Sequence, residues 1–284
     1  MSVVLALAGC GGDPIEPAVA PAPVAPPPSA PAAEAPAPSA PAGEPAAATS
    51  GSSEGQDPST RMAAIVEAPD RLPGDRELDA GRQPAKLLAF IGLEPGMRVG
   101  ELGAGGGYTT ELLARSVGPT GKVYAQNSKF ILERFAEKPW SERLARPVMA
   151  NVVRVDREFS DPLPPDAKEL DAVVSVLFYH DTVWMKTDRD AMNRAVFEAL
   201  KPGGVYVVAD HTARAGAGVS ESETLHRIEE GAVRQEVERA GFKLQGSADF
   251  LRNPSDTLDW NASPRKAGDR RGQSDRFVLK FVKP

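Results

Sequence analysis

The sequence has little cysteine and no long hydrophobic run. Its 284 residues include a single cysteine, Cys10, so neither a disulfide nor a cysteine-rich metal site can form within one chain. No apolar stretch approaches the roughly 18 residues that a transmembrane helix requires. These absences exclude a disulfide-bonded scaffold and predict no membrane-spanning helix.

Basic residues are missing from the first 60 positions, which hold six acidic residues. Subtracting those six from the 39 acidic residues leaves 33, equal to the number of Lys and Arg. The rest of the chain is therefore neutral overall. A neutral domain lacks the positive field on which nucleic-acid binding normally depends, so we expect no nucleic acid as partner.

Aromatic residues are absent between Gly11 and Pro58, where almost every residue is Ala, Pro, Gly, Ser or Glu. Such a segment cannot bury enough apolar surface to fold, which predicts a disordered linker over 11–58. Residues 1–10 end in Leu7-Ala8-Gly9-Cys10 and resemble a bacterial lipoprotein signal. The resemblance implies lipidation of Cys10 and an anchor in the membrane of the cell envelope. The alternative is a cytoplasmic enzyme with an apolar N-terminus.

The folded part, residues 59–284, alternates short apolar runs with amphipathic stretches. This alternation predicts an α/β domain with a mainly parallel sheet and helices on both faces. The expected strands are 98–102, 122–126, 151–155, 170–177, 205–209, 242–246 and 276–282. The expected helices are 77–91, 108–117, 129–137, 187–200 and 225–240, with a turn at 201–204.

A glycine motif, Glu101-Leu102-Gly103-Ala104-Gly105-Gly106-Gly107, follows the first expected strand and opens a helix. Glycines let the backbone approach a ligand closely, and the free N–H groups of a helix N-terminus favour an anionic group. As a nicotinamide-binding fingerprint the motif fails at its last glycine, where Tyr108 stands.

Two further segments add to this motif. One is the expected central strand Leu170-Asp171-Ala172-Val173-Val174. The other, Leu200-Lys201-Pro202-Gly203-Gly204, comes after it, between a helix and a strand. With the glycine motif, these segments resemble the class I S-adenosylmethionine-dependent methyltransferases over about 84–283. Arg71 to Arg76 and Leu225-His226-Arg227 resemble a bacterial group of predicted methyltransferases.

The resemblance implies a Rossmann-like, seven-stranded sheet and S-adenosylmethionine as cofactor. Gly103, Ala104, Gly105 and Gly107 would line its methionine half, and Glu101 would hold the loop or the amino group. Asn127 stands where an acidic residue usually binds the ribose, which leaves a weaker hydrogen bond. Asp156 would bind the adenine amino group. The charged residues Arg76, Asp79 and Arg82 either fold over the cofactor or form a solvated face.

Two histidines follow central strands: His180, with Asp181, follows one, and His211 follows another. Tyr179, next to His180, is expected either in an apolar wall over the methyl group or in core or lid packing. Ligands of open α/β sheets bind at these strand ends, so we expect both histidines near the transferred methyl group. His180 is the first candidate for a general base and His211 the second.

The alternatives for these histidines stay open. They can cap strand ends, or Asp181, Asp210 and His211 can bind magnesium, manganese or calcium. We expect His226 at the surface or in packing, and assign no metal site.

The sequence therefore predicts methyl transfer to a small-molecule acceptor. The alternatives are a methyltransferase-like binding module without turnover, favoured by Asn127, and a nicotinamide-dependent oxidoreductase.

Overall fold

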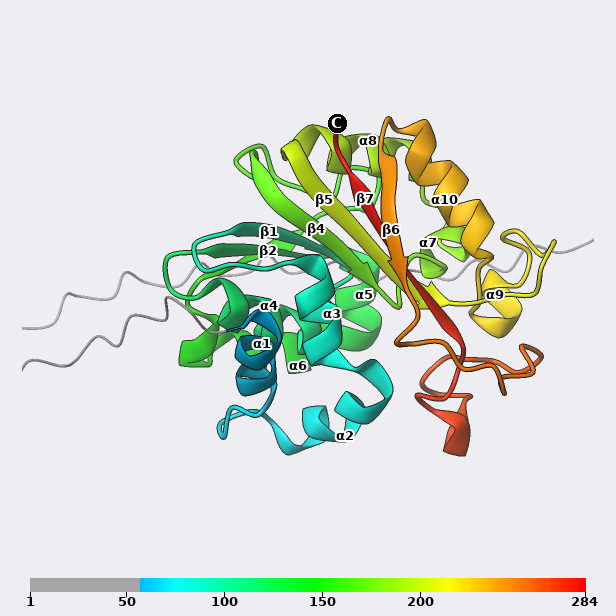
Figure 1. Ribbon diagram of the computed structural model, residues 1–284, viewed down its shortest axis with the longest axis horizontal. Coiled ribbons are helices and arrows are strands. Elements are labelled where there is room, and N and C mark those ends of the chain that lie inside the picture. The colour runs from blue at the N-terminus through cyan, green and yellow to red at the C-terminus, as the bar shows by residue number, and fades with distance from the viewer. Residues whose placement is uncertain (1–56) are drawn as a thin grey trace, which may run out of the picture. The chain divides into compact units, whose positions relative to one another are not determined.

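The computed structural model describes residues 57–284, which contain one seven-stranded sheet (Figure 1). The strand order is β3-β2-β1-β4-β5-β7-β6. Strands β1 to β5 pair in parallel, whereas β7 is antiparallel to both β5 and β6. This confirms the predicted Rossmann-like, mainly parallel sheet. The strands are β1 (Arg98–Leu102), β2 (Lys122–Asn127), β3 (Val152–Asp156), β4 (Leu170–Val176), β5 (Leu200–His211), β6 (Lys243–Ala248) and β7 (Arg276–Val282).

The helices form two groups. Helices α1, α3 and α4 pack together beside β1 and β2, and α8 and α10 pack together beside β5, β6 and β7 (Figure 1). The α-helices are α1 (Pro58–Val66), α2 (Pro73–Arg82), α3 (Pro84–Ile91), α4 (Tyr108–Val117), α5 (Lys129–Ile131), α6 (Glu137–Leu144), α7 (Asp181–Trp184), α8 (Arg189–Ala199), α9 (Ser222–Leu225) and α10 (Glu230–Arg239). A π-helical turn, Leu132–Ala136, joins α5 to α6, and two 3-10 turns lie at Pro147–Met149 and Gly268–Arg270.

The centre of the sheet is covered on both faces. In β4, Leu170, Val173 and Val174 have no exposed surface, as expected of a strand that is nearly continuous in apolar residues. The neighbouring β5 contributes Val207 and Val208, which are equally buried. This rigid centre fixes the positions of the residues that follow each strand.

The first predicted helix, 77–91, is in fact two helices. Gln83 has a left-handed backbone with φ of 46° and separates α2 from α3. Pro84 has no N–H for a helical hydrogen bond, so it can begin a helix but not continue one. The break turns α2 away from α3, and α2 becomes available to cover another part of the molecule.

Two other predicted boundaries were wrong for tertiary reasons. The expected turn at 201–204 is a bulge within β5, where the N–H of Gly203 donates to the carbonyl of Lys283. The expected helix 225–240 begins only at Glu230, as α10, because α9 ends at Leu225. Between them, Ile228 pairs with Thr212 and leaves the helical path.

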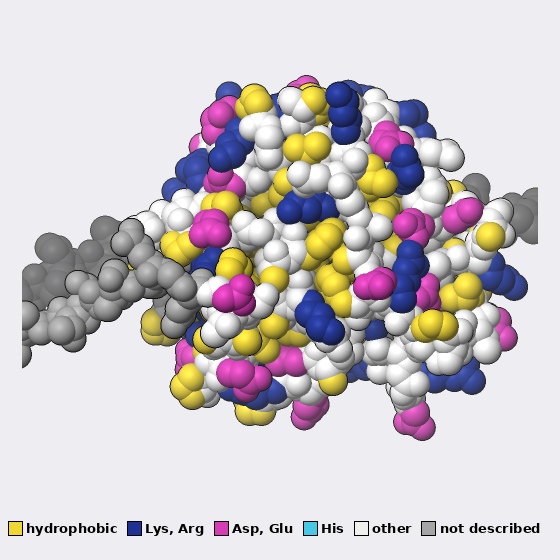
Figure 2. Space-filling model, in the orientation of Figure 1, with side chains coloured by type: hydrophobic (Ala, Val, Ile, Leu, Met, Phe, Trp, Pro, Cys, Tyr) yellow, Lys and Arg dark blue, Asp and Glu magenta, His cyan; other side chains and the backbone are white. Residues whose placement is uncertain are grey.

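The predicted lipoprotein segment 1–10 and the linker up to residue 56 lie outside the described residues. Asp57, at the end of that linker, caps α1 by accepting a hydrogen bond from the backbone of Thr60. No helix between residues 57 and 284 is long and apolar enough to cross a bilayer. On the face drawn in Figure 2, acidic and basic side chains are interspersed.

Candidate active site

A cavity of about 830 Å³ opens at the carboxyl ends of β1, β4 and β5. This is the edge of a parallel sheet at which α/β proteins bind their ligands. The glycine loop forms one side of the cavity, and the residues after β4 and β5 form another. Its apolar wall comes from the segment after β2 and from α7, with Ile131, Phe135 and Trp184.

The glycine loop is shaped by close contacts at some positions and by open space at others. A Cβ atom on Gly107 would lie 2.6 Å from the Trp140 ring, and one on Gly103 would lie 2.4 Å from the Phe178 ring. A Cβ atom on Gly105 would meet no atom within 4 Å. All three glycines have positive φ, which other residues adopt only with strain. Gly105 therefore presents bare backbone to the cavity.

Glu101 lies at the bottom of the cavity with 3% of its surface exposed. Its carboxylate accepts a hydrogen bond of 2.5 Å from the Thr110 hydroxyl. Burial raises the pKa of Glu101 to about 7, although Thr110 and the positive charges of Arg82 and Arg143 act in the opposite direction. A cationic ligand group beside Glu101 would therefore stabilise its ionised form.

Two carboxylates of α2, Asp75 and Asp79, connect this helix to the glycine loop. Arg143 donates to the carbonyl of Gly106 and to both carboxylate oxygens of Asp75, at 2.6 Å, 2.6 Å and 2.9 Å. The Tyr108 hydroxyl donates to Asp79, which also pairs with Arg71. Asp75 and Asp79 of α2 therefore hold this helix beside the loop, and its expected place over the cofactor stays a prediction.

Arg82, at the end of α2, has a positive charge without a carboxylate partner. Its guanidinium lies over the Tyr108 ring at 4.4 Å and lines the cavity. The nearby acids Asp75 and Asp79 pair with other arginines, and within residues 57–284 Arg82 forms no ion pair. Burial lowers the pKa of Arg82 from its usual value. An anionic ligand in the cavity would compensate this charge.

Two predicted cofactor-binding residues lie elsewhere. The Asn127 amide accepts from the N–H of Gly105 at 2.8 Å and donates to its carbonyl at 3.1 Å, so Asn127 supports the loop. Asp156 is exposed and pairs with Arg154 at 2.9 Å. Neither side chain lines the cavity. In the structure Asn127 thus holds the glycine loop and Asp156 pairs with Arg154, and their expected contacts with the ribose and the adenine stay predictions.

The predicted first base, His180, is held between two carboxylates. Its Nδ1 lies 2.7 Å from an oxygen of the fully buried Asp210, and its Nε2 lies 3.2 Å from Asp181. Burial lowers the pKa of His180, but the two negative charges outweigh it and raise the pKa to about 10. Without a bound ligand, this pKa favours the protonated form of His180, which speaks against the base role expected of it.

His211 has the opposite electrostatics. Burial, together with the positive charges of His180 and Arg276, lowers its pKa well below the ordinary value. Its Nδ1 lies 2.7 Å from the Ser274 hydroxyl, and the ring lines the cavity. His211 is neutral at neutral pH, so its Nε2 can accept a proton from a ligand when Nδ1 donates to Ser274.

Tyr179 does not reach the cavity, which corrects its predicted place in the site. It is fully buried, its hydroxyl donates to Glu236 at 2.9 Å and it accepts from Asn193 at 2.8 Å. Asp181, by contrast, lines the cavity beside His226. His226 was expected only at the surface or in packing, and nothing in its local sequence indicated that it would approach His180.

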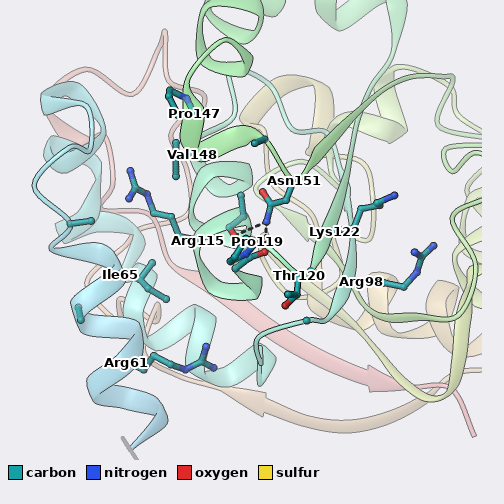
Figure 3. Close-up of a pocket in the computed structure, with 17 residues that line it drawn as sticks. Arg61, Ile65, Arg98, Arg115, Pro119, Thr120, Lys122, Pro147, Val148 and Asn151 are labelled. Carbon is teal, nitrogen blue, oxygen red and sulfur yellow. Dashed lines mark hydrogen bonds between the residues drawn. The ribbon is translucent and has the colours of Figure 1, made fainter. Parts of the chain in front are cut away.

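A second hollow, of about 940 Å³, lies at the opposite edge of the sheet (Figure 3). Arg98 and Lys122, at the amino ends of β1 and β2, line it together with Arg61 and Arg115. Asn151 in this hollow is engaged with the carbonyls of Ala114 and Gly118. The hollow contains none of the glycine loop, so we place the candidate site at the other edge.

Several solved structures that share this arrangement are described as methyltransferases. A SAM-dependent methyltransferase from Aquifex aeolicus aligns with a TM-score of 0.52 at 18% identity, covering 81% of this chain and 100% of that one. A putative sarcosine dimethylglycine methyltransferase from Galdieria sulphuraria aligns with a TM-score of 0.52 at 17% identity, covering 80% and 98%. The chain has the fold of the SAM-dependent methyltransferases. The fold predicted from the sequence is thereby confirmed.

Sequence comparison adds a narrower similarity within the methyltransferases. Residues 58–149 match the family model of protein-L-isoaspartate (D-aspartate) O-methyltransferase. The protein-L-isoaspartate O-methyltransferases of Pyrococcus horikoshii and Methanosarcina mazei are 27% and 24% identical over 145 and 148 residues, or 51% and 52% of this chain. The matched regions span 58% and 55% of those relatives. The family model covers the glycine loop but none of the residues after β3.

The raised pKa of Glu101 predicts how the free energy of unfolding depends on pH when no ligand is bound. A carboxyl whose folded pKa is about 7, above its ordinary 4.5, contributes stability below pH 4.5 and loses it as pH rises through 7. Replacing Glu101 with Gln removes that loss. At pH 8 the variant should exceed the wild type in free energy of unfolding by about 1–3 kcal/mol.

Urea unfolding at pH 5 and pH 8 measures this difference. It should be smaller at pH 5, because the buried Glu101 of the folded wild type is then neutral, as the glutamine of the variant is. Glu133→Gln is a suitable control, since the Glu133 side chain is 64% exposed. A variant of Glu101 that is less stable than the wild type at both pH values would contradict the assignment.

Proposed function

We propose that the protein transfers a methyl group from S-adenosylmethionine to a small-molecule acceptor bound in the cavity. The observation that carries this proposal is the meeting of three groups in one cavity: the bare glycine loop, the buried Glu101 carboxylate and the uncompensated Arg82 guanidinium. The methyltransferase fold and the family match over 58–149 support it.

The residues present fit the methionine end of this cofactor. Glu101 offers a carboxylate to its amino group, and Arg82 offers a cation to its carboxylate beside the open backbone of Gly105. The wall formed by Ile131 and Phe135 is apolar and suits an aromatic base. When bound, the cofactor supplies an electrophilic methyl group on a sulfonium. The protein's own part is to align the two reactants and exclude water.

His211 is our candidate for the base that takes a proton from the acceptor. It is neutral, it lines the cavity, and Ser274 fixes the orientation of its ring. His180 instead pairs with the buried Asp210 behind the acceptor side of the cavity. His211 and His180 thus have different tasks, although the sequence suggested the same task for both.

The acceptor side of the cavity comes from residues beyond the region that matches the family model. It includes His211, Glu223, Ser263 and Lys266. A cavity of about 830 Å³ has room for the cofactor and a small molecule. We therefore propose a small-molecule acceptor, and make an isoaspartyl peptide the comparison substrate in the assay.

A binding module without turnover is the second candidate function. It is favoured by Asn127 and Asp156, since neither of these expected ribose and adenine partners lines the cavity. Product formation separates the two functions, because a binding module would bind S-adenosylmethionine without consuming it when candidate acceptors are present.

Calorimetric titration of the full chain tests cofactor binding through Arg82. We expect S-adenosylmethionine and S-adenosylhomocysteine to bind, and Arg82→Gln to weaken both by about 10- to 100-fold, the worth of one charge-assisted hydrogen bond. Arg234→Gln is the matched control, because Arg234 lies exposed on α10. Absence of heat with either ligand at millimolar concentration would rule out the proposed function.

A further inference from the structure

Three side chains meet on one wall of the cavity with an unusual geometry. The Nε2 of His180, the Nδ1 of His226 and a carboxylate oxygen of Asp181 are each 3.2 Å from the other two. Within residues 57–284, these three side chains form the group of His, Cys, Asp or Glu residues whose possible metal-ligand atoms lie close together. All three line the cavity. They come from two separate segments, the start of α7 and the end of α9.

A triangle of donor atoms with equal 3.2 Å edges suits a metal ion. An ion about 1 Å above the plane of the three atoms lies about 2.1 Å from each, the usual metal–nitrogen and metal–oxygen distance. The angles between ligands are then about 100°, intermediate between octahedral and tetrahedral values. Because the three atoms occupy one side of the ion, its other positions remain open to water or a ligand.

The groups behind the triangle orient its members. Asp210, which has no exposed surface, accepts from Nδ1 of His180 at 2.7 Å and so directs Nε2 toward the triangle. The indole N–H of Trp184 donates to the Asp181 oxygen at 2.7 Å. A carboxylate on the far nitrogen of a histidine is the usual support of a metal-binding imidazole.

The backbone at His226 is held in a strained conformation. Its φ is 52°, in the left-handed region that residues other than glycine rarely adopt. The next residue, Arg227, is fully buried and pairs with Asp256, which fixes the chain on that side. Strain of this kind persists where the surroundings enforce it, and it is concentrated at functional sites.

Hydrogen bonds alone do not account for the triangle. The Nε2 atom of His180 carries at most one hydrogen, in the plane of its ring, which cannot point to His226 and Asp181 together. Each edge of 3.2 Å is also at the long limit of an ordinary hydrogen bond. A single cation would satisfy all three atoms at once.

We propose that His180, Asp181 and His226 bind a divalent transition-metal ion such as Fe²⁺, Mn²⁺, Co²⁺ or Zn²⁺. Two imidazoles and one carboxylate suit these ions better than Mg²⁺ or Ca²⁺, which prefer oxygen ligands alone. The ion's open positions adjoin the cavity, where they can take an oxygen or nitrogen atom of the acceptor.

This ligand set differs from the one expected from the sequence, which consisted of Asp181, Asp210 and His211. The oxygens of Asp210 accept from His180 and from the backbone of His211. The Nδ1 of His211 is engaged with Ser274. The proposed site does not depend on methyl transfer, because metal content can be measured without turnover.

Metal titration of the chelator-treated full chain at about pH 8 tests the proposal. We expect one equivalent of Co²⁺ with a new visible absorption band, displacement of Co²⁺ by Zn²⁺, and much weaker binding of Mg²⁺ and Ca²⁺. His226→Asn should weaken Co²⁺ binding by more than about 100-fold, since removal of even a supporting residue costs 10- to 100-fold. Asparagine tolerates the left-handed backbone at this position.

The chain's three histidines provide a matched control. His211→Asn should bind Co²⁺ as the wild type does, and Asp181→Asn should lose it even if His226→Asn unfolds. Circular dichroism checks the fold of each variant. The proposal is overturned if the wild type takes up no Co²⁺ at millimolar concentration, or if folded His226→Asn and Asp181→Asn bind Co²⁺ like the wild type.

Discussion

Replacing Arg227 with methionine is expected to lower the free energy of unfolding by about 3–5 kcal/mol, the usual cost of breaking a fully buried ion pair. Arg227 and Asp256 have no exposed side-chain surface and lie 2.9 Å apart. The guanidinium also donates to the carbonyls of Trp260 and Thr212, at 3.1 Å and 3.0 Å. Methionine would leave the carbonyls and the carboxylate without this donor in a buried region.

Urea unfolding followed by circular dichroism measures the loss. Arg234→Met, on the exposed face of α10, should change stability by less than about 0.5 kcal/mol. Adding Asp256→Asn to Arg227→Met should cost less than the sum of the two single changes, because the buried charge disappears with its partner. A loss below 1 kcal/mol for Arg227→Met would show that the pair does not hold this region together.

Replacing Gly107 with alanine should strongly destabilise the protein. Its φ is 84°, and a Cβ atom would lie 2.6 Å from the Trp140 ring and 2.7 Å from the Arg143 side chain. Left-handed strain and overpacking together amount to about 2–5 kcal/mol of stability. Trp140 is fully buried and cannot yield without moving α6.

Gly105→Ala provides a comparison within the same loop. Its φ is also positive, at 55°, but the added methyl group would enter open space. We expect a stability loss of about 1–2 kcal/mol from strain alone, together with weaker binding of S-adenosylmethionine. Unfolding and calorimetry on both variants separate the effects. Equal stability losses for Gly105→Ala and Gly107→Ala would contradict the packing argument.

The sequence predicted best where the structure is local. Every strand except β5 was expected within two residues of its observed bounds, because apolar runs between turn residues mark strands directly. The break at Gln83 was missed although Pro84 signals it, and α7 (Asp181–Trp184) was missed because it is a single short turn. The division between α9 and α10 could not be foreseen, since it follows from burial of Arg227 against a segment 29 residues away.

The site was predictable in position but not in orientation. The motifs placed Glu101, the glycine loop and His211 at one edge of the sheet. Glu101, residues 103–106 and His211 line the cavity, whereas Gly107 packs against Trp140. Asn127 and Tyr179 were assigned to that edge as well, but their side chains bond to neighbouring backbone and to α10. Sequence patterns give the strand end at which a residue stands. The direction of its side chain depends on partners distant in the sequence.

The position of β7 in the sheet affects how the chain folds during its synthesis. Because β7 lies between β5 and β6, the edge of β5 has no partner until residues 276–282 have left the ribosome. Ser274, which orients His211, arrives at the same moment. An unpaired strand edge on a growing chain invites association with other chains. The nascent protein is therefore expected to need protection from a chaperone until β7 inserts, and His211 to gain its hydrogen-bond partner Ser274 only then.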